Sequence, residues 1–130
     1  MTTLLLDTHV VHWLTAEPNR LSQDAGEAIK SANTLAIAAI TWYELAWLAH
    51  HGRIQTAVPV RSWLTGLAED LLTLPITPAI SETAASLPDS FPGDPADRLI
   101  YATAIEKGLQ LVSKDRRLRA HRFPRPLVVW

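Results

Sequence analysis

The sequence predicts an α/β fold of three layers, an α/β/α sandwich whose mostly parallel central sheet has four to five strands. Short runs made only of apolar residues are typical of strands buried on both faces of a sheet. These runs alternate with longer segments that have apolar residues at helical spacing, which is typical of parallel sheets covered by helices. The 130 residues contain no repeat and no linker, so we expect a single domain, 1–130.

The first quarter of the chain is predicted to form one strand and two helices. The apolar run TLLLD, 3–7, is a short buried strand. The segment VVHWLTA, 10–16, is a helix that ends near a proline. A second helix over 21–32 has Ser22 as its N-cap and apolar residues at helical spacing.

The middle of the chain is predicted to add two strands and two helices. The run TLAIAAI, 34–40, is a second buried strand, and the helix over 41–52 ends at Gly52. A further helix covers 58–71. The third strand, LTLPIT over 72–77, contains a proline and is therefore a weak strand.

The last third is predicted to contain two helices and two strands. A helix over 78–87 starts with proline in its first turn. The segment LPDSFPGD, 87–94, is rich in proline, glycine, serine and aspartate and is therefore a loop. The helix over 95–108 ends at a glycine. The fourth strand covers 109–113, and a short fifth strand covers 126–130.

The composition excludes several kinds of chemistry. The chain has no cysteine, so it has no disulfide, no thiolate nucleophile and no cysteine-bound metal. Its start has no basic leader, and no run reaches the roughly 18 apolar residues that a membrane span needs. We therefore expect a cytoplasmic protein with no membrane partner.

The formal net charge of −1 conceals a basic region near the C-terminus. Between Arg98 and Arg125, eight Lys and Arg residues stand against Glu106 and Asp115. A basic face attracts polyanions. Solvated side chains on an exposed helix explain the same pattern equally well.

Five acids fall where an open α/β sheet places its binding sites, beyond the carboxyl ends of the strands. Asp7 ends the first strand, and Asp115 follows the fourth. Asp94 and Asp97 open the helix that leads into the fourth strand, and Glu44 lies one turn into the helix after the second. We expect these five carboxylates to converge at one edge of the sheet.

Glu44 is the most informative of the five acids. It is the only charged residue from Thr34 to Ala49, in a helix that is apolar on nearly all sides and is therefore expected to be largely buried. A buried carboxylate without a partner is destabilising or becomes protonated. A cation held jointly with Asp7 and Asp97 would remove that cost.

The other acids also have purely structural interpretations. Asp7 could cap the following helix, and Asp115 could be an ordinary turn residue. Asp94 precedes a proline at the first helical position, which is a common N-cap arrangement. Asp97 then falls at the third helical position, where a carboxylate interacts well with the helix dipole. We predict that Asp94 is a helix cap first and a contributor to a metal site second.

A site made of carboxylate oxygens favours Mg²⁺ or Mn²⁺ over zinc or copper. These ions on a carboxylate cluster suit the hydrolysis of phosphodiester bonds. Thr8 and Ser113 could orient a carboxylate or a water, but helix capping is the preferred interpretation for both. The histidines are interpreted as bystanders: His9, His12, His50, His51 and His121.

Several blocks of the chain resemble a known family. They include LLLDTHVVHWL, AIAAITWYELAWLAHHGRI and GDPADRLIYATAIEKGLQLVSKDRRLR, in that order and across essentially the whole chain. With these blocks the sequence resembles the PIN-domain ribonucleases, specifically the toxin subunits of VapBC-type toxin–antitoxin pairs. One departure is Pro92, because related sequences often carry a histidine just before GDP.

The resemblance implies a PIN-like α/β/α domain that cleaves RNA with Mg²⁺ or Mn²⁺. It implies that four acids are catalytic metal ligands: Asp7, Glu44, Asp97 and Asp115. Asp94 matches an acid shared by one subgroup and is a further implied ligand. The resemblance also implies a homodimer that is silenced by a cognate antitoxin, whose C-terminal segment wraps over the active site.

Two surfaces are predicted to bind partners. A row of arginines is expected to bind the RNA backbone: Arg116, Arg117, Arg119 and Arg122. The apolar surface around Trp42 and Trp47, together with the first helix, is expected to form part of a protein interface, because aromatic residues are enriched at interfaces. Core packing is the alternative for both tryptophans.

Three other interpretations of the whole chain remain open. A phosphoacceptor receiver domain has a similar size, but it needs an aspartate at the end of its third strand, and 72–77 contains no acid. A phosphatase of the haloacid dehalogenase type needs a second aspartate two residues after the first, where this chain has His9. A PIN fold that only binds RNA or protein is the third, and the full set of acids argues against it.

Overall fold

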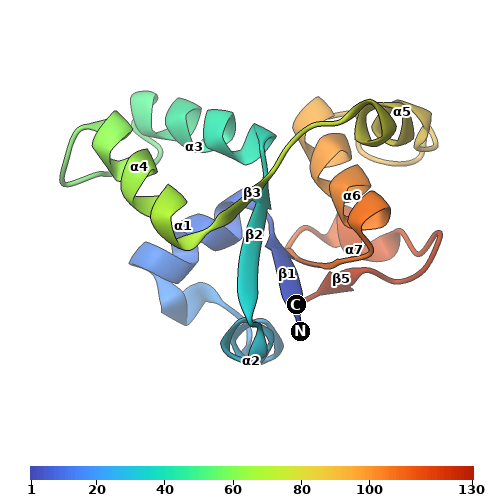
Figure 1. Cartoon of the computed structure of the whole chain (residues 1–130), viewed down its shortest axis with the longest axis horizontal. Helices are drawn as coiled ribbons and strands as arrows, with labels where there is room; N and C mark the ends of the chain where they lie inside the picture. Colours follow the sequence, from blue (N-terminus) through green and yellow to red (C-terminus); the bar gives the residue numbers. More distant parts are fainter.

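The computed structural model describes residues 1–130 and has a sheet of five parallel strands between two layers of helices (Figure 1). The strands are β1 (Thr3–Leu6), β2 (Thr34–Ala38), β3 (Leu72–Leu74), β4 (Gln110–Val112) and β5 (Val128–Val129). The helices are α1 (Thr8–Ala16), η1 (Pro18–Arg20, a 3₁₀ turn), α2 (Gln23–Ser31), α3 (Ile40–His50), α4 (Val60–Asp70), α5 (Pro78–Ser86), α6 (Pro95–Lys107) and α7 (Arg116–Ala120). The strand order is β3-β2-β1-β4-β5, and every neighbouring pair is parallel. The predicted three-layer architecture is confirmed.

Both faces of the sheet are buried because successive strand residues point to opposite sides. Leu5 and Ala36 pack with Ile100 and Tyr101 of α6. Leu4 and its neighbours on the other face pack with side chains of α1, α2 and α3. Figure 1 shows α3 and α4 on one side of the strands and α6 and α7 on the other. The apolar runs of the sequence therefore form the middle layer, as predicted.

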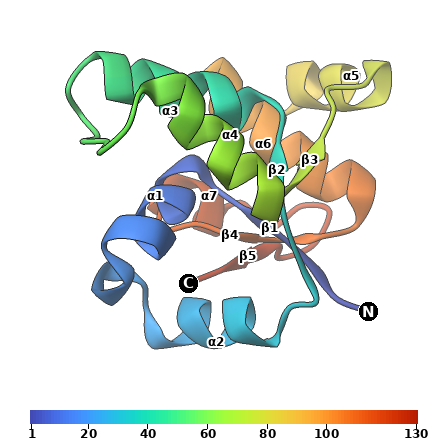
Figure 2. The same cartoon turned by 60° about the vertical axis from the view of Figure 1, so that its left-hand side comes forward.

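Different helices lie at the amino ends and at the carboxyl ends of the strands. Figure 2 shows α2 beneath the amino ends of β1 and β2 and α3 above their carboxyl ends. Helix α3 contacts both α1 and α6. The last of these, α6, ends at Gly108, whose φ of 66° is the left-handed conformation that glycine adopts most easily. Helices α1, α3 and α7 follow the carboxyl ends of β1, β2 and β4 along the chain, and α6 contacts α3. Side chains of these four helices can therefore meet at that edge of the sheet.

Some predicted boundaries were wrong. The third strand ends at Leu74 rather than at residue 77, because Pro75 cannot donate a ladder hydrogen bond. The second strand ends at Ala38, the fifth covers only two residues, and the first helix starts earlier, at Thr8. The short elements η1 and α7 were not predicted.

The expectation that the helix over 41–52 is largely buried was also wrong. In α3 only Thr41 and Leu45 are buried, whereas Tyr43 is 65% exposed and Trp47 is 42% exposed. The helix packs through one side, and its other side carries these aromatic rings. An apolar sequence thus marks a partly exposed surface here.

The strand order also bears on the receiver-domain alternative. Receiver-type sheets have the order 2-1-3-4-5, whereas here β3 lies at the edge beside β2. The order therefore excludes a receiver domain. None of the helices combines the length and the apolar character that a membrane crossing requires.

Candidate active site

Four of the predicted acids line one hollow of about 580 Å³ at the carboxyl ends of β1 and β4. Asp7 directly follows β1, and its backbone N–H donates to the carbonyl of Val112 at 3.0 Å, which joins the ends of the two strands. Asp115 follows the end of β4 by three residues. Asp94 and Asp97 reach the same hollow from the start of α6. The predicted convergence of these four acids is therefore what the structure shows.

Asp7 is held firmly at the bottom of this arrangement. Its side chain is 7% exposed in the folded protein. Oδ2 accepts a hydrogen bond from the Ser113 hydroxyl at 2.6 Å, and Oδ1 accepts one from the Thr8 N–H at 2.8 Å. Burial raises the pKa of Asp7, and these two hydrogen bonds only partly oppose it. Ser113 thus orients a carboxylate, and its oxygen also accepts the Asp115 N–H at 3.1 Å just before α7, so both interpretations of Ser113 have a contact in the structure.

Glu44 does not line the hollow but is coupled to it through Thr8. The Thr8 hydroxyl donates to Glu44 Oε1 at 2.5 Å. Thr8 Oγ1 also lies 3.1 Å from the hydroxyl of Thr41, and since its single proton goes to Glu44, Thr41 is the donor in that pair. Burial raises the pKa of Glu44, the Thr8 bond opposes this, and the negative charge of Asp7 adds to it. Of the two interpretations of Thr8, the structure supports the orienting of a carboxylate, and the preferred capping role was wrong because Asp7 is the N-cap of α1.

Asp94 and Asp97 have different surroundings although they lie on the same turn. Asp94 Oδ1 accepts the Ala96 N–H at 2.9 Å, so Asp94 is the N-cap of α6 as predicted. Asp97 accepts no hydrogen bond from another residue. Its pKa is raised to about 7, first by burial and then by the negative charges of the other four acids. All five acids therefore share one electrostatic environment.

Asp115 is the one acid with a cation of its own. It caps α7, and Arg117 Nη2 lies 3.0 Å from its Oδ2. Partial burial alone would raise the pKa of Asp115, but the hydrogen bonds and charge of Arg117 outweigh it and hold the pKa below its ordinary value. The same nitrogen lies 3.7 Å from Asp97 Oδ2. Arg117 thus supplies positive charge at one side of the hollow.

The donor set suits a hard divalent cation. As the side chains stand, no three Asp, Glu or His groups are close enough to hold one ion together. Burial and mutual repulsion nevertheless raise the pKa of three of these acids, and a cation would stabilise their charged forms. Arg117 contacts only two of the five carboxylates. An ion bound here would have to draw the side chains inward.

Several residues of the hollow were not predicted as part of the acidic site. They are His9, Trp13, Arg20, Lys114 and Arg117, of which Arg117 was predicted only to bind the RNA backbone and His9 only to be a bystander. The guanidinium of Arg20 lies 4.5 Å from the centre of the Trp13 ring, and the ammonium of Lys114 lies 5.6 Å from it. Only His9 among the histidines lines the hollow, so it is not remote from the acids. No sequence spacing links Arg20 or Trp13 to Asp97, whereas the place of Arg117 in the acidic site could have been predicted from its position two residues after Asp115.

The comparisons with known proteins are consistent with one another. The sequence pattern of the PIN domain family matches residues 4–124. The chain is 65% identical to Ribonuclease VapC22 of Mycobacterium tuberculosis (strain ATCC 25618 / H37Rv) over 130 residues, the full length of both chains. A toxin–antitoxin complex from Klebsiella pneumoniae contains a chain with the same fold, at a TM-score of 0.70 and 22% identity, covering 98% of this chain and 96% of that chain. VapBC2 from Rickettsia felis, solved with a DNA fragment from its promoter, gives a TM-score of 0.71 at 16% identity, with 98% and 97% covered.

Proposed function

The chain belongs to the PIN-domain family, and from this membership we propose that it is a metal-dependent endoribonuclease, the toxin of a toxin–antitoxin pair. The observation that carries the proposal is the convergence of four carboxylates on one hollow, with Glu44 linked to Asp7 through Thr8. The raised pKa of Asp97 is consistent with that crowding of negative charge. Such a cluster repels an RNA phosphate unless a cation is present. The full-length identity of 65% to a protein named as a ribonuclease supports the same activity.

The residues proposed to hold the ion and carry the reaction are those predicted from the sequence: Asp7, Glu44, Asp97 and Asp115, with Asp94 as a further ligand. When bound, Mg²⁺ or Mn²⁺ lowers the pKa of a water and neutralises charge on the leaving oxygen. Ser113 and Thr8 fix the carboxylates of Asp7 and Glu44 before any ligand arrives. That preorganisation reduces the cost of assembling the site.

Asp97 has a distinct part in this proposal. Because it accepts no hydrogen bond from the protein and its ion-pair contact with Arg117 is 3.7 Å long, its oxygens can take an ion or a proton released by the attacking water. Arg117 and Lys114 stand at the rim of the same hollow and hold a phosphate of the substrate. The acids alone could not attract that phosphate.

The biological assembly is part of the same proposal. We expect a cognate antitoxin to bind this chain, since solved structures with the same fold are toxin–antitoxin complexes. We also expect a homodimer and a cytoplasmic location.

An RNA cleavage assay tests the activity. Purified protein should cleave structured RNA with Mg²⁺ or Mn²⁺ and stop when EDTA is added, and Asp97→Asn should abolish cleavage. Asp89→Asn is the matched control, because Asp89 is an exposed acid outside the hollow and its loss should change nothing. Cleavage that continues in excess EDTA, or in Asp97→Asn, would contradict the proposal. RNA binding without cleavage under either metal would instead indicate the non-catalytic alternative.

A further inference from the structure

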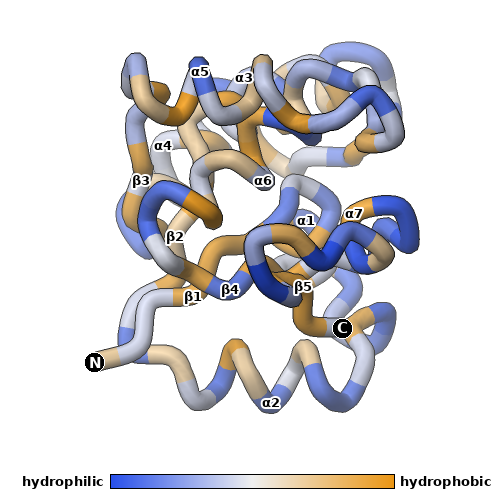
Figure 3. Tube along the Cα trace, turned by 90° about the vertical axis from the view of Figure 1, so that its right-hand side faces the viewer, coloured by the Kyte–Doolittle hydropathy of each residue, from blue (hydrophilic) through white to orange (hydrophobic).

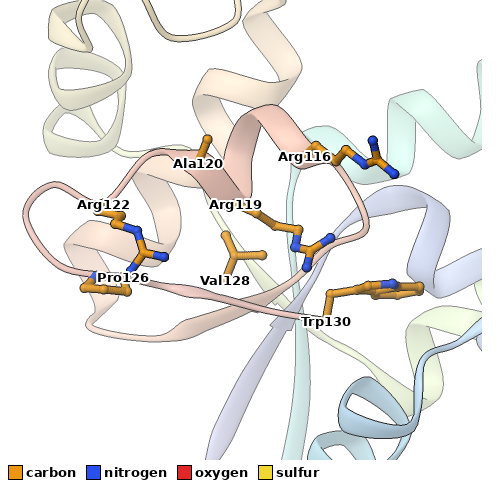
Figure 4. A pocket seen from close by; sticks show the side chains of 7 residues that line it. All are labelled: Arg116, Arg119, Ala120, Arg122, Pro126, Val128 and Trp130. Carbon is orange, nitrogen blue, oxygen red and sulfur yellow. The ribbon is translucent and has the colours of Figure 1, made fainter.

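A second hollow, which we call the arginine hollow, lies beside β5 and has a volume of about 700 Å³. It is lined by Arg116, Arg119, Ala120, Arg122, Pro126, Val128 and Trp130. Figure 4 shows Arg119 extending over β5 toward Trp130, with Arg122 beside Pro126. The hydrophilic segment around α7 lies next to β5 and the C-terminal residue (Figure 3). The volume of the arginine hollow is in the range of roughly 300–1,000 Å³ that small-ligand sites have.

The positive charge of this hollow is not neutralised by the protein. Arg116, Arg119 and Arg122 are exposed and form no ion pair with any acid of the chain. Their neighbour Arg117 differs, since it is paired with Asp115 and lines the hollow of the four acids described above, which we call the carboxylate hollow. The arginines of α7 thus line two different hollows. The three free guanidinium groups present planar donors that suit phosphate oxygens.

An aromatic pair joins the arginine hollow to the carboxylate hollow. Trp130 lines the first and Trp13 lines the second, and their ring centres are 5.9 Å apart. Trp130 is half-buried: it packs against the core on the α1–α3 face of the sheet and also lines the arginine hollow. Lys114 lies over Trp13 on the carboxylate side. Trp13 itself is buried at 7% exposure, so the accessible groups between the two hollows are Trp130 and the exposed Lys114. A chain molecule could extend from one hollow to the other along these groups.

We propose that the arginine hollow binds a single-stranded segment of RNA that continues from the bond to be cut in the carboxylate hollow. The guanidinium groups hold its phosphates, and Trp130 stacks on an unpaired base. The ligand class rests on the proposed function. The protein as a whole has a net charge of −1, and the proposed cleavage site combines four acids with Arg20, Lys114 and Arg117. An adjacent surface that is basic without acids therefore adds attraction for a polyanion.

An acidic peptide is the rival ligand, and the indole argues against it. Carboxylates would use the arginines but would not use the Trp130 side chain that lines the same hollow. A nucleotide uses both, because every base has a face that stacks on an aromatic ring. We therefore commit to RNA and treat a peptide as an outcome of the test.

The test measures binding in EDTA, where cleavage is absent. A short fluorescein-labelled single-stranded RNA of mixed sequence is titrated with protein over a salt series, and fluorescence anisotropy is recorded. Arg116→Ala/Arg119→Ala should reduce the slope of log affinity against log salt by about 1.4, since each phosphate contact contributes about 0.7 for single strands. Arg61→Ala/Lys107→Ala is the matched control, because it removes two exposed positive charges from α4 and α6 and should leave the slope unchanged.

The stacking part is tested at Trp130. Trp130→Leu should weaken binding roughly 5- to 150-fold with the salt slope unchanged, and Trp130→Phe should stay close to wild type because it keeps an aromatic face. Circular dichroism identifies any variant that fails to fold. If Trp130→Phe weakens binding as much as Trp130→Leu, or if duplex RNA shows the same dependence on Trp130, the stacking role is wrong.

Two further results would overturn the proposal as a whole. One is a salt slope for Arg116→Ala/Arg119→Ala equal to that of the control variant. The other is an acidic peptide whose binding falls in this variant while RNA binding does not. The proposed activity is judged separately, by cleavage in Mg²⁺ and its loss in Asp97→Asn. Protein that binds RNA through the arginines but never cleaves it would support this inference and contradict the proposed function.

Discussion

At the scale of single residues, Asp97 is the side chain on which the charges of the site converge. Its pKa in the folded protein is about 7, compared with 3.8 for an ordinary aspartate. Between these values the folded state keeps a proton that the unfolded state has lost. The contribution of Asp97 to stability is therefore fully present below about pH 3.8 and is lost as the pH rises through about 7.

The raised pKa of Asp97 predicts how the stability of the metal-free protein depends on pH. In EDTA, the free energy of unfolding should fall as the pH rises from about 4 to about 7, and Asp97→Asn should flatten that dependence. At neutral pH the variant should be at least as stable as wild type, because it lacks the repelled charge. Asp7 and Glu44 shift in the same direction, so some slope should remain. Urea denaturation across this pH range measures the free energy of unfolding. If its pH dependence is the same in Asp97→Asn as in wild type, Asp97 does not have the raised pKa.

Asp94 should behave as a cap. Asp94→Ala removes the acceptor for the Ala96 N–H and should lower the free energy of unfolding by about 0.5–2 kcal/mol. Asp94→Ser should recover most of that loss, because a hydroxyl can accept the same hydrogen bond. Thermal and denaturant unfolding of both variants in EDTA decide this. If Ser is no better than Ala, the main role of Asp94 is not capping.

At the scale of elements, the loop before α6 is held by one side chain of that helix. Arg98 Nε donates to the Pro92 carbonyl at 2.9 Å, and its two terminal nitrogens donate to four more carbonyls. Those carbonyls belong to the end of α5 and the following loop: Ala84, Leu87, Pro88 and Phe91. The loop leads directly into Asp94 and Asp97. Arg98 therefore fixes the position from which two of the five acids reach the hollow.

Replacing Arg98 should affect both stability and cleavage. Arg98→Ala leaves five carbonyls without this donor and should cost at least about 1.5–3 kcal/mol of unfolding free energy. Arg98→Lys should recover only part, because an ammonium cannot span five acceptors as a planar guanidinium does. Arg61→Ala, an exposed arginine on α4, should stay within about 0.5 kcal/mol of wild type. Equal stability of Arg98→Lys and wild type would show that the loop does not need the guanidinium.

The sequence predicts the longer elements well and the short ones poorly. The strands β1, β2 and β4 are apolar runs, and α6 has a clear cap, a proline start and a glycine end, so each is encoded locally. Helix α7 has five residues, too few for a periodic pattern, and η1 has three. Which residues of α3 are exposed could be predicted only in part, because the apolar residues on its exposed side are as hydrophobic as those of a buried helix.

The site residues that local sequence patterns encode could likewise be predicted, and those that depend on contacts between distant segments could not. The five acids could be predicted because strand ends and helix starts place them by a general rule of α/β sheets. The hydrogen bond from Ser113 to Asp7 joins residues 106 positions apart, and no local pattern encodes it. The pairing of Arg117 with Asp97 depends on α7, which was not predicted. Contacts between elements are what the sequence alone leaves open.

At the scale of the whole molecule, α3 carries an exposed aromatic stripe. Tyr43 and Trp47 are four residues apart and so lie on one side of the helix, and Trp47 stacks on His51 with ring centres 3.9 Å apart. Trp42, which was predicted to join the interface, packs against the core instead and donates its indole N–H to Thr73. The core-packing alternative is thus confirmed for Trp42, while Trp47 stays a candidate for an interface.

The exposed stripe of Tyr43 and Trp47 is the expected contact surface of the proposed homodimer. Exposed aromatic rings gain most by burial against another protein surface, so a second copy of the chain is expected to cover Tyr43 and Trp47. Sedimentation at tens of micromolar should give a dimer for wild type and a shift toward monomer for Tyr43→Ser/Trp47→Ser. Phe123→Ser is the control, because Phe123 is 77% exposed on the loop before β5 and its loss should leave the dimer intact. A strictly monomeric wild type would contradict the homodimer, and a variant that stays dimeric would place the interface elsewhere.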